Sequence, residues 1–285
     1  MKKLEEEDHI RVEKMCEVLE VSRSGYYAFK SGKRSKRIDK DKETIKLVKQ
    51  IFEQNRKVYG ARRIAKKLKK DGHHVSKRKV REIMKEAGLV AIQNRKYKAT
   101  TNSNHTNEVA PNILAETKVT YANQVWVTDI TYIDTEEGWL YLATVMDIYT
   151  KEMVGYSMGD RITKELVMIA MKAAIAKEKP EDGLIAHSDR GVQYTSNDYR
   201  ELLRINNMEC SMSKKGNPYD NAAMESFNGT LKIELIYPHG KYKTRAEGRN
   251  DIFEYIEAFY NRVRLHSSIG YMSPREFKES LKEVA

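Results

Sequence analysis

Cysteine is scarce in this chain, which argues against a disulfide-bonded fold and against a zinc site with cysteine ligands. The 285 residues include only two cysteines, Cys16 and Cys210, which lie far apart and outside any CxxC pair. Neither a disulfide framework nor a cysteine zinc site is therefore indicated. Long apolar runs are also missing, because the most apolar segment, LVMIAMKAAIA, is interrupted by Lys172 and is too short to span a bilayer. Since no apolar stretch of signal-peptide type occurs in the start, MKKLEEEDHI, we expect a cytoplasmic protein without a membrane partner.

Two common catalytic motifs are also missing. The sequence contains no G-x-x-x-x-G-K-[ST] phosphate loop, so neither nucleotide hydrolysis nor a nucleotide cofactor is indicated. Ser188 stands between His187 and Asp189, but this is not a hydrolase triad. Neighbouring strand residues point to opposite faces, and the G-x-S-x-G elbow is absent.

Charge is plentiful and unevenly distributed. Residues 1–100 hold 30 Lys and Arg against 14 Asp and Glu, a net charge of +16, whereas residues 101–285 hold 22 against 27, a net charge of −5. The chain is long enough for two domains with a sizeable core in at least one. A basic run is often only a solvated helix face, but it is also the electrostatic signature of a nucleic-acid-binding domain.

The first 39 residues predict a helical segment, which could be a partial helix-turn-helix. A short helix, a turn at Glu20 and Val21, and a second short helix capped by Ser22 are expected within residues 10–30.

Residues 40–90 carry a stronger helical pattern. Apolar residues at helical spacing predict three helices, around residues 45–52, 61–68 and 80–87, with Ser76 as the N-cap of the third and Gly88 just past its end. The short turn DGHHV between the second and third helices predicts a helix-turn-helix. The third helix would then present its first turns to a DNA major groove. The candidate DNA-binding residues are Lys77, Arg78, Lys79, Arg81, Arg62 and Arg63. The alternative is a basic three-helix bundle that only solvates itself.

After a polar linker at residues 91–119, the pattern changes to mixed α/β. Three β-rich runs joined by turns are followed by helix, strand, helix, strand and further helices. The far end of the linker, APNILAETKV, is expected to pack on the region that comes after it. This element order predicts a ribonuclease H-like fold for residues 120–285, a mixed sheet flanked by helices.

Three acidic residues stand in distinctive settings within this region. Asp129 lies in the apolar strand WVTDITYI, where a charged carboxylate is costly unless something compensates it. Asp189 follows it by 60 residues and ends a predicted strand in HSDRGVQY; Glu225 follows by a further 36. Carboxylates from separate elements can converge to hold two divalent cations, which activate an attacking oxygen and stabilise a leaving oxygen at phosphorus. The three residues therefore predict phosphodiester chemistry.

The helix of Glu225 supports this interpretation. Its buried stripe is expected to be Phe227, Leu231 and Leu235, while another face carries a polar set suited to metals and a phosphate backbone. This polar set is Asn221, Glu225, Asn228 and Lys232, the last as a candidate DNA contact.

Each acid also has a simpler interpretation. Asp129 could be a solvated strand residue, Asp189 a turn or capping group, and Glu225 an exposed helix carboxylate. Asp147 is expected to be structural or to support the site, and Glu234 is a weaker rival to Glu225. His187 could lie near the metals or be a buried, hydrogen-bonded histidine.

Together the flanking words resemble those of the DDE transposases, in particular the OrfB protein of the insertion-sequence-three family, whose core is similar to retroviral integrase. The resemblance rests on the words around Asp129, Asp189 and Glu225, on VYGARRIAKKL and VSKRKVREIMKEAGL, and on the ending YNRVRLHSSIGYMSPREF. It covers nearly the whole chain. Within that ending, Arg264 and His266 could contact DNA or hold a terminal helix on the core. The zinc-binding amino-terminal module of retroviral integrases has no counterpart, because His73 and His74 lack cysteine partners nearby.

The resemblance implies a function in DNA transposition. The three acids would be catalytic and hold two Mg²⁺, for which Mn²⁺ could substitute. The chain would cut and join DNA at the terminal inverted repeats of an insertion sequence and in target DNA. It would self-associate on DNA and act as a fusion with, or bind, the product of an upstream reading frame. Two alternatives stay open: a metal-dependent nuclease that does not join strands, and an inactive element-derived DNA-binding regulator.

Overall fold

The computed structural model describes residues 11–31, 33–92, 110–213 and 222–282, with backbone alone for residues 33–40. The chain divides into two compact units, residues 1–91 and 92–285. None of the helices in the described ranges is long and apolar enough to cross a membrane.

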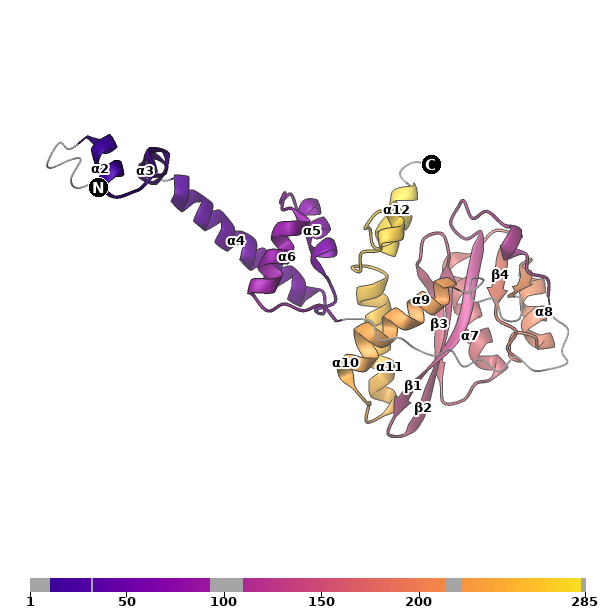
Figure 1. Ribbon diagram of the computed structural model, residues 1–285. Coiled ribbons are helices and arrows are strands. Elements are labelled where there is room, and N and C mark those ends of the chain that lie inside the picture. The colour runs from indigo at the N-terminus through magenta and orange to yellow at the C-terminus, as the bar shows by residue number, and fades with distance from the viewer. Residues whose placement is uncertain (1–10, 32, 93–109, 214–221, 283–285) are drawn as a thin grey trace. The chain divides into compact units, whose positions relative to one another are not determined.

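The described part of the first unit contains the two short helices expected from the sequence, α2 (Val12–Val18) and α3 (Arg23–Lys30) (Figure 1). The Oγ of Ser22 accepts a hydrogen bond from the backbone N–H of Gly25 at 3.1 Å, which caps α3 as predicted. The turn between them contains Glu20 at a positive φ of 51°.

Three further helices follow among the described residues of this unit, namely α4 (Lys33–Gln54), α5 (Ala61–Lys70) and α6 (Lys77–Glu86). They confirm the three predicted helices, although α4 begins before residue 40. Most of the predicted apolar positions are buried in the core, namely Val48, Ile51, Phe52, Ile64, Leu68, Val80, Ile83 and Met84, whereas Ile45, Ala61, Ala65 and Ala87 are only half-buried. Ser76 caps α6 by accepting from the N–H of Lys79 at 3.2 Å, and Gly88 follows the helix with a φ of +65°.

The second unit is built on a five-stranded mixed sheet in the order β3-β2-β1-β4-β5. Its strands are β1 (Val125–Thr135), β2 (Gly138–Asp147), β3 (Met153–Gly159), β4 (Ile185–Ser188) and β5 (Glu209–Met212). The first three form antiparallel hairpins, whereas β4 and β5 run parallel to β1. All five strands were predicted, and they give the ribonuclease H-like architecture expected from the element order.

Helices cover both faces of this sheet (Figure 1). On one face lie α7 (Lys164–Glu178) and α8 (Asn197–Ile205), whose apolar residues form a core with Trp126 and Val145 of the sheet. Gly155 allows α7 to approach β3 closely, because a Cβ there would lie 2.4 Å from the carbonyl oxygen of Ala170.

The other face is covered by α9 (Ala222–Leu231) and α11 (Arg245–Glu254). The remaining segments are η1 (Leu114–Glu116), the π-helical turns η3 (Lys232–Ile236) and η4 (Tyr255–Tyr260), α10 (Tyr237–His239), η5 (Ser267–Ile269) and α12 (Pro274–Lys282).

The end of the linker packs on the sheet, as predicted. The N–H groups of Ile113 and Leu114 donate to Ser211 Oγ at 3.0 and 3.3 Å, and the Met212 N–H donates to the Pro111 carbonyl. Residues 93–109 lie outside the described residues.

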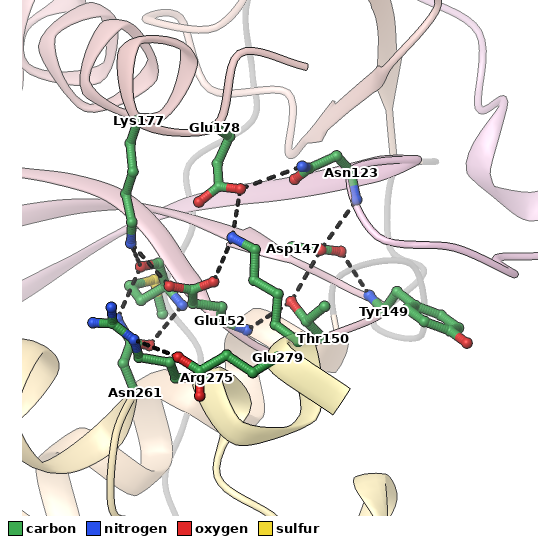
Figure 2. A network of polar contacts seen from close by, with 12 residues as sticks. Asn123, Asp147, Tyr149, Thr150, Glu152, Lys177, Glu178, Asn261, Arg275 and Glu279 are labelled. Atoms are coloured by element: carbon green, nitrogen blue, oxygen red, sulfur yellow. Dashed lines mark hydrogen bonds and ion pairs between the residues drawn. The ribbon is translucent and has the colours of Figure 1, made fainter. Parts of the chain in front are cut away.

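A polar network holds α12 on the core (Figure 2). Glu152, which is 5% exposed, pairs with Lys177 at 3.0 Å and with Lys278 of α12 at 2.8 Å. Lys278 also pairs with Glu178. Asp147 is part of the same region, where it accepts hydrogen bonds from the N–H groups of Asn123 and Tyr149. These contacts give Asp147 a structural role in the β2–β3 turn.

Candidate active site

Asp129 and Asp189 come from neighbouring parallel strands. β1 and β4 pair from Val125 with Ile185 to Val127 with His187, so the two acids stand at equivalent positions two residues further along. Asp189 directly follows β4, and its Oδ1 accepts a hydrogen bond from the Gly191 N–H at 2.9 Å, which fixes the turn. The strand order therefore brings together two acids that are 60 residues apart.

The electrostatics of Asp129 indicate a cluster of negative charge. The pKa of its carboxyl is raised to about 7, first by burial and then by the negative charges of Asp189 and Glu225. The Ile130 backbone and the Lys232 ammonium oppose this increase in pKa. A carboxyl whose pKa is raised by burial and by neighbouring carboxylates is common in sites that bind a cation or transfer a proton.

Asn228 and Lys232 approach Asp129 from the helical side. The Nδ2 of Asn228 donates to Asp129 Oδ2 at 2.8 Å, across α9 and β1. The Oδ1 of Asn228 is buried and has no hydrogen-bond partner in the described part of the chain. The predicted apolar stripe is buried beneath them at Phe227, Leu231 and Leu235. Asn221, also predicted on the polar face, lies outside the described residues.

Glu225 lies close enough to Asp129 for the two charges to interact, but it does not converge with the aspartates on a single metal-binding point. It is exposed in the first turn of α9, and its charge contributes to the raised pKa of Asp129. Nowhere in the described ranges do three or more His, Cys, Asp or Glu side chains converge closely enough to hold one metal ion. The structure thus sets Asp129 and Asp189 on neighbouring strands, with Glu225 of α9 close enough for its charge to act on Asp129.

The chemistry of these donors fits a hard divalent cation such as Mg²⁺. Carboxylate oxygens are the ligands that Mg²⁺ prefers, and a cation would offset both the burial of the Asp129 charge and its repulsion by the other carboxylates. The buried, unpartnered Oδ1 of Asn228 leaves one acceptor beside them for a water molecule.

This raised pKa predicts that Asp129→Asn stabilises the metal-free protein in a pH-dependent way. The carboxyl has a higher pKa folded than unfolded, so its contribution to stability is complete below the unfolded pKa and is lost as the pH rises to about 7. The variant should therefore gain little near pH 4 and on the order of 1 kcal/mol or more above pH 7. Urea unfolding across this range in excess chelator measures the gain.

Added Mg²⁺ provides the control for that experiment. It should stabilise the wild type more than the variant and so narrow the difference between them. A gain in stability that does not change with pH would show that the charge of Asp129 is already compensated within the protein.

His187 is buried in the sheet and hydrogen-bonded, as one of its two interpretations anticipated. Its Nδ1 lies 2.9 Å from Ser211 Oγ, which also accepts from two backbone N–H groups of the linker end. Because those donors occupy the serine lone pairs, the serine hydroxyl donates to Nδ1. His187 thus connects β4, β5 and the linker end.

Glu234 and Arg264 form a buried ion pair away from the carboxylate cluster. Arg264 binds both carboxylate oxygens of Glu234, at 2.8 and 2.7 Å, and the Tyr255 hydroxyl donates to the same carboxylate at 2.8 Å. His266 lies beside this pair, with its Nε2 3.3 Å from Arg264 and its ring against Tyr260. These contacts place Arg264 where it holds the carboxyl-terminal segment on the core, which is one of the two roles considered for it.

Sequence reasoning missed Tyr194 as a neighbour of the site. Its buried hydroxyl lies 3.2 Å from Thr128 Oγ1, and its pKa is raised well above the usual value by burial and by the charges of Asp129 and Asp189. The only signal was its place in HSDRGVQY, five residues after Asp189.

In the first unit, the predicted DNA-binding residues occupy different environments. Lys77, Arg78, Arg81 and Arg62 are exposed. Lys79 is partly buried and pairs with Asp41 at 3.4 Å, while the Arg63 guanidinium lies 5.7 Å from the centre of the Tyr59 ring. Arg78 pairs with Glu82 one turn along α6 at 3.6 Å.

Family models match three parts of the chain. An HTH-like domain matches residues 39–97, and two integrase core domain models match residues 119–218 and 206–274. The matches thus fall in both units.

Similar proteins were found among insertion elements. The "Insertion element IS600 uncharacterized 31 kDa protein" of Shigella sonnei is 48% identical over 95% of this chain and 100% of its own length. The "Transposase for insertion sequence element IS904" of Lactococcus lactis is 44% identical over 81% of this chain and 92% of its own. The transposase InsF for insertion sequence IS3A of Escherichia coli is 37% identical over 94% of this chain and 93% of its own.

Among solved structures, the HTLV-2 integrase catalytic core domain in complex with magnesium aligns with a TM-score of 0.43 and 16% identity over 55% of this chain and 96% of that chain. The similarity to these insertion-element proteins extends over most of the chain, and an HTH-like domain precedes an integrase core domain in it. These two findings establish the family of the chain. The chain belongs to this family of insertion-sequence transposases, which carry out DNA transposition and integration.

Proposed function

We propose that this transposase cuts DNA at the ends of its element and joins the freed strands to target DNA, using Asp129, Asp189 and Glu225 to hold two Mg²⁺. The observation that carries this proposal is the parallel register of β1 and β4, which sets Asp129 beside Asp189, with Asn228 of the Glu225 helix hydrogen-bonded to Asp129 at 2.8 Å. Mn²⁺ is proposed as a substitute because it accepts the same oxygen ligands. The test is cleavage and joining of labelled element-end DNA by amide variants of the three acids.

The protein's own residues prepare the site for a phosphodiester. Asp129 within β1, Asp189 just after the neighbouring strand β4, and Glu225 on α9 would hold the cations, while the Asn228 amide orients the Asp129 carboxylate. When bound, Mg²⁺ supplies activation of the attacking oxygen and charge stabilisation of the leaving oxygen. Strand joining needs no nucleotide cofactor, because the phosphodiester that is broken already stores the energy of the new bond.

DNA recognition is proposed to reside in the first unit, mainly on the exposed face of α6. Three cationic side chains there, Lys77, Arg78 and Arg81, point away from a core formed by Val80, Ile83 and Met84. A helix that follows a short turn and carries cations in its first turns suits a major groove. Lys79, Arg62 and Arg63 are proposed to contribute phosphate contacts at the edge of this surface, and Lys232 is proposed to do so beside the carboxylates.

Replacement of Arg78 and Arg81 by Ala in the full chain should weaken duplex DNA binding by about 10-fold or more. It should also lower the slope of log affinity against log salt concentration by the amount expected for about two fewer phosphate contacts. Titration of labelled DNA at several salt concentrations measures both. The matched control is Lys46→Ala with Lys49→Ala, which removes the same charge from exposed positions on α4.

Equal losses for the two double variants would assign binding to net charge rather than to α6. A separate fragment of residues 1–91 should also bind duplex DNA, because these residues form a compact unit. Its binding should be weakened by the same α6 substitutions.

Further partners and location are proposed on the family resemblance. Joining two element ends requires more than one DNA-binding region, so the chain is proposed to self-associate on DNA and to act as a fusion with an upstream-frame product. A cytoplasmic location is proposed with them.

A further inference from the structure

An exposed aromatic pair lies on the β1–β2 hairpin. Tyr132 of β1 is 41% exposed and Trp139 of β2 is 46% exposed. Their ring centroids are 5.0 Å apart at 82°, an edge-to-face arrangement. The strand register pairs Tyr132 with Tyr141 and Asp134 with Trp139, so the two rings are diagonal neighbours on one face of the hairpin.

Lys232 connects this pair to the carboxylate cluster. Its ammonium lies 4.8 Å from the centre of the Tyr132 ring, and its charge also lowers the pKa of Asp129. Tyr132 and Asp129 point to opposite faces of β1. Beyond Val127, however, the described strands leave β1 paired only with β2, apart from a bridge between Thr135 and Tyr242. The side chain of Lys232 can therefore reach groups on both faces of β1 around this unpaired edge of the strand.

Stabilisation of the hairpin is the simpler role for such a pair, but it does not explain the exposure. An aromatic pair stabilises a sheet through the area it buries, and here roughly half of each side chain faces solvent. The surroundings are also charged. Lys241 pairs with Asp134 at 3.3 Å, and Arg245 donates to the Trp139 carbonyl at 3.0 Å. Cations beside exposed aromatic faces favour a ligand that has both a flat base and a phosphate over an apolar peptide.

We propose that Tyr132 and Trp139 form a stacking platform for an unpaired base at a DNA end, with Lys232 binding the adjacent phosphate. This inference rests on the proposed function, because it needs DNA at the carboxylate cluster. A strand that places a phosphodiester at Asp129 and continues around the open edge of β1 reaches Lys232 and then the two rings. The platform would hold the end of the strand after the duplex has been opened there.

Tryptophan fluorescence tests this placement in the full chain. The chain contains two tryptophans, of which Trp126 is fully buried and Trp139 is exposed. A duplex of arbitrary sequence with a few unpaired thymines at one end should quench the Trp139 signal, while the same duplex with blunt ends should not. Trp139→Phe should leave only the Trp126 signal, and that signal should be insensitive to either DNA.

Binding measurements separate stacking from stability. Trp139→Leu keeps an apolar side chain but removes the ring, so it should lose the preference for the unpaired end by about 5-fold to 100-fold. Trp139→Phe should keep most of it. Tyr121→Ala, at another aromatic residue of this unit that is 58% exposed, is the matched control and should keep all of it. Thermal unfolding of each variant monitors the fold, and Tyr132→Leu provides a second test if Trp139→Leu does not fold.

Two results would overturn the platform: no quenching by the unpaired end, or equal preference in the Trp139→Leu and Trp139→Phe proteins. Either result alongside normal strand cleavage by the wild type would leave the proposed function intact. Conversely, a wild type that binds the unpaired end through Trp139 but never cuts or joins DNA would support the platform and overturn the proposed function.

Discussion

Asp129→Asn, Asp189→Asn and Glu225→Gln should each reduce strand cleavage and joining by about a thousandfold or more, while DNA binding through the first unit survives. An amide keeps the size and hydrogen-bonding capacity of the carboxyl but removes the negative charge that offsets a cation. The decisive measurement is cleavage and joining of labelled element-end DNA by each variant. Double substitutions should be hardly worse than single ones, because groups that act as a unit are strongly non-additive.

Asp134→Asn is the matched control for these variants. It removes a carboxylate from the same strand, but this one is exposed and paired with Lys241. Its cleavage and joining should stay near the wild-type level. Near-normal joining by the Asp189→Asn protein would contradict the two-metal mechanism.

The dependence of joining on metal ions is an independent test of the same mechanism. Mg²⁺ or Mn²⁺ should support joining, and Ca²⁺ should permit binding with little turnover, because its looser coordination suits in-line displacement poorly. Comparable joining in excess chelator would exclude metal dependence.

The sequence predicted the elements of the second unit because their patterns are strong. The apolar run around Asp129 and the strand ending at Asp189 are short and bounded by turns, which distinguishes them from helices. The helix of Glu225 was placed by its buried residues Phe227 and Leu231.

Contacts between distant elements were harder to predict. The parallel register of β1 and β4 explains why Asp129 meets Asp189, yet no local pattern encodes which strands pair. Tyr194 was missed for that reason. The π-helical turns η3 and η4 were also missed, because an i→i+5 turn leaves no distinct apolar period.

Glu234 shows a further limit of reading one helix at a time. In the sequence it competes with Glu225 as a third acid, because both are carboxylates on the same helical segment. In the structure its partner is Arg264, 30 residues later, and both side chains are less than a tenth exposed. Burial against a distant arginine, rather than helical spacing, therefore distinguishes the two acids.

Arg264→Met should destabilise the second unit by about 3–5 kcal/mol, because it leaves the Glu234 carboxylate buried without its cation. The pair and the Tyr255 hydroxyl satisfy one another, and this pairing raises the pKa of Arg264 above its usual value despite burial. Urea unfolding followed by tryptophan fluorescence measures the loss, since Trp126 and Trp139 both lie in the second unit.

Two comparisons make the result specific to the buried pair. Glu234→Leu combined with Arg264→Met should recover most of the stability, because replacing both charges leaves neither uncompensated. Arg204→Met breaks the exposed pair with Glu201, whose side chains are 72% and 55% exposed, and should leave the unfolding midpoint nearly unchanged. If Arg264→Met instead folds as stably as the wild type and loses DNA binding, Arg264 contacts DNA. In that case the carboxyl-terminal segment is held on the core by the Glu152–Lys278 network of α12.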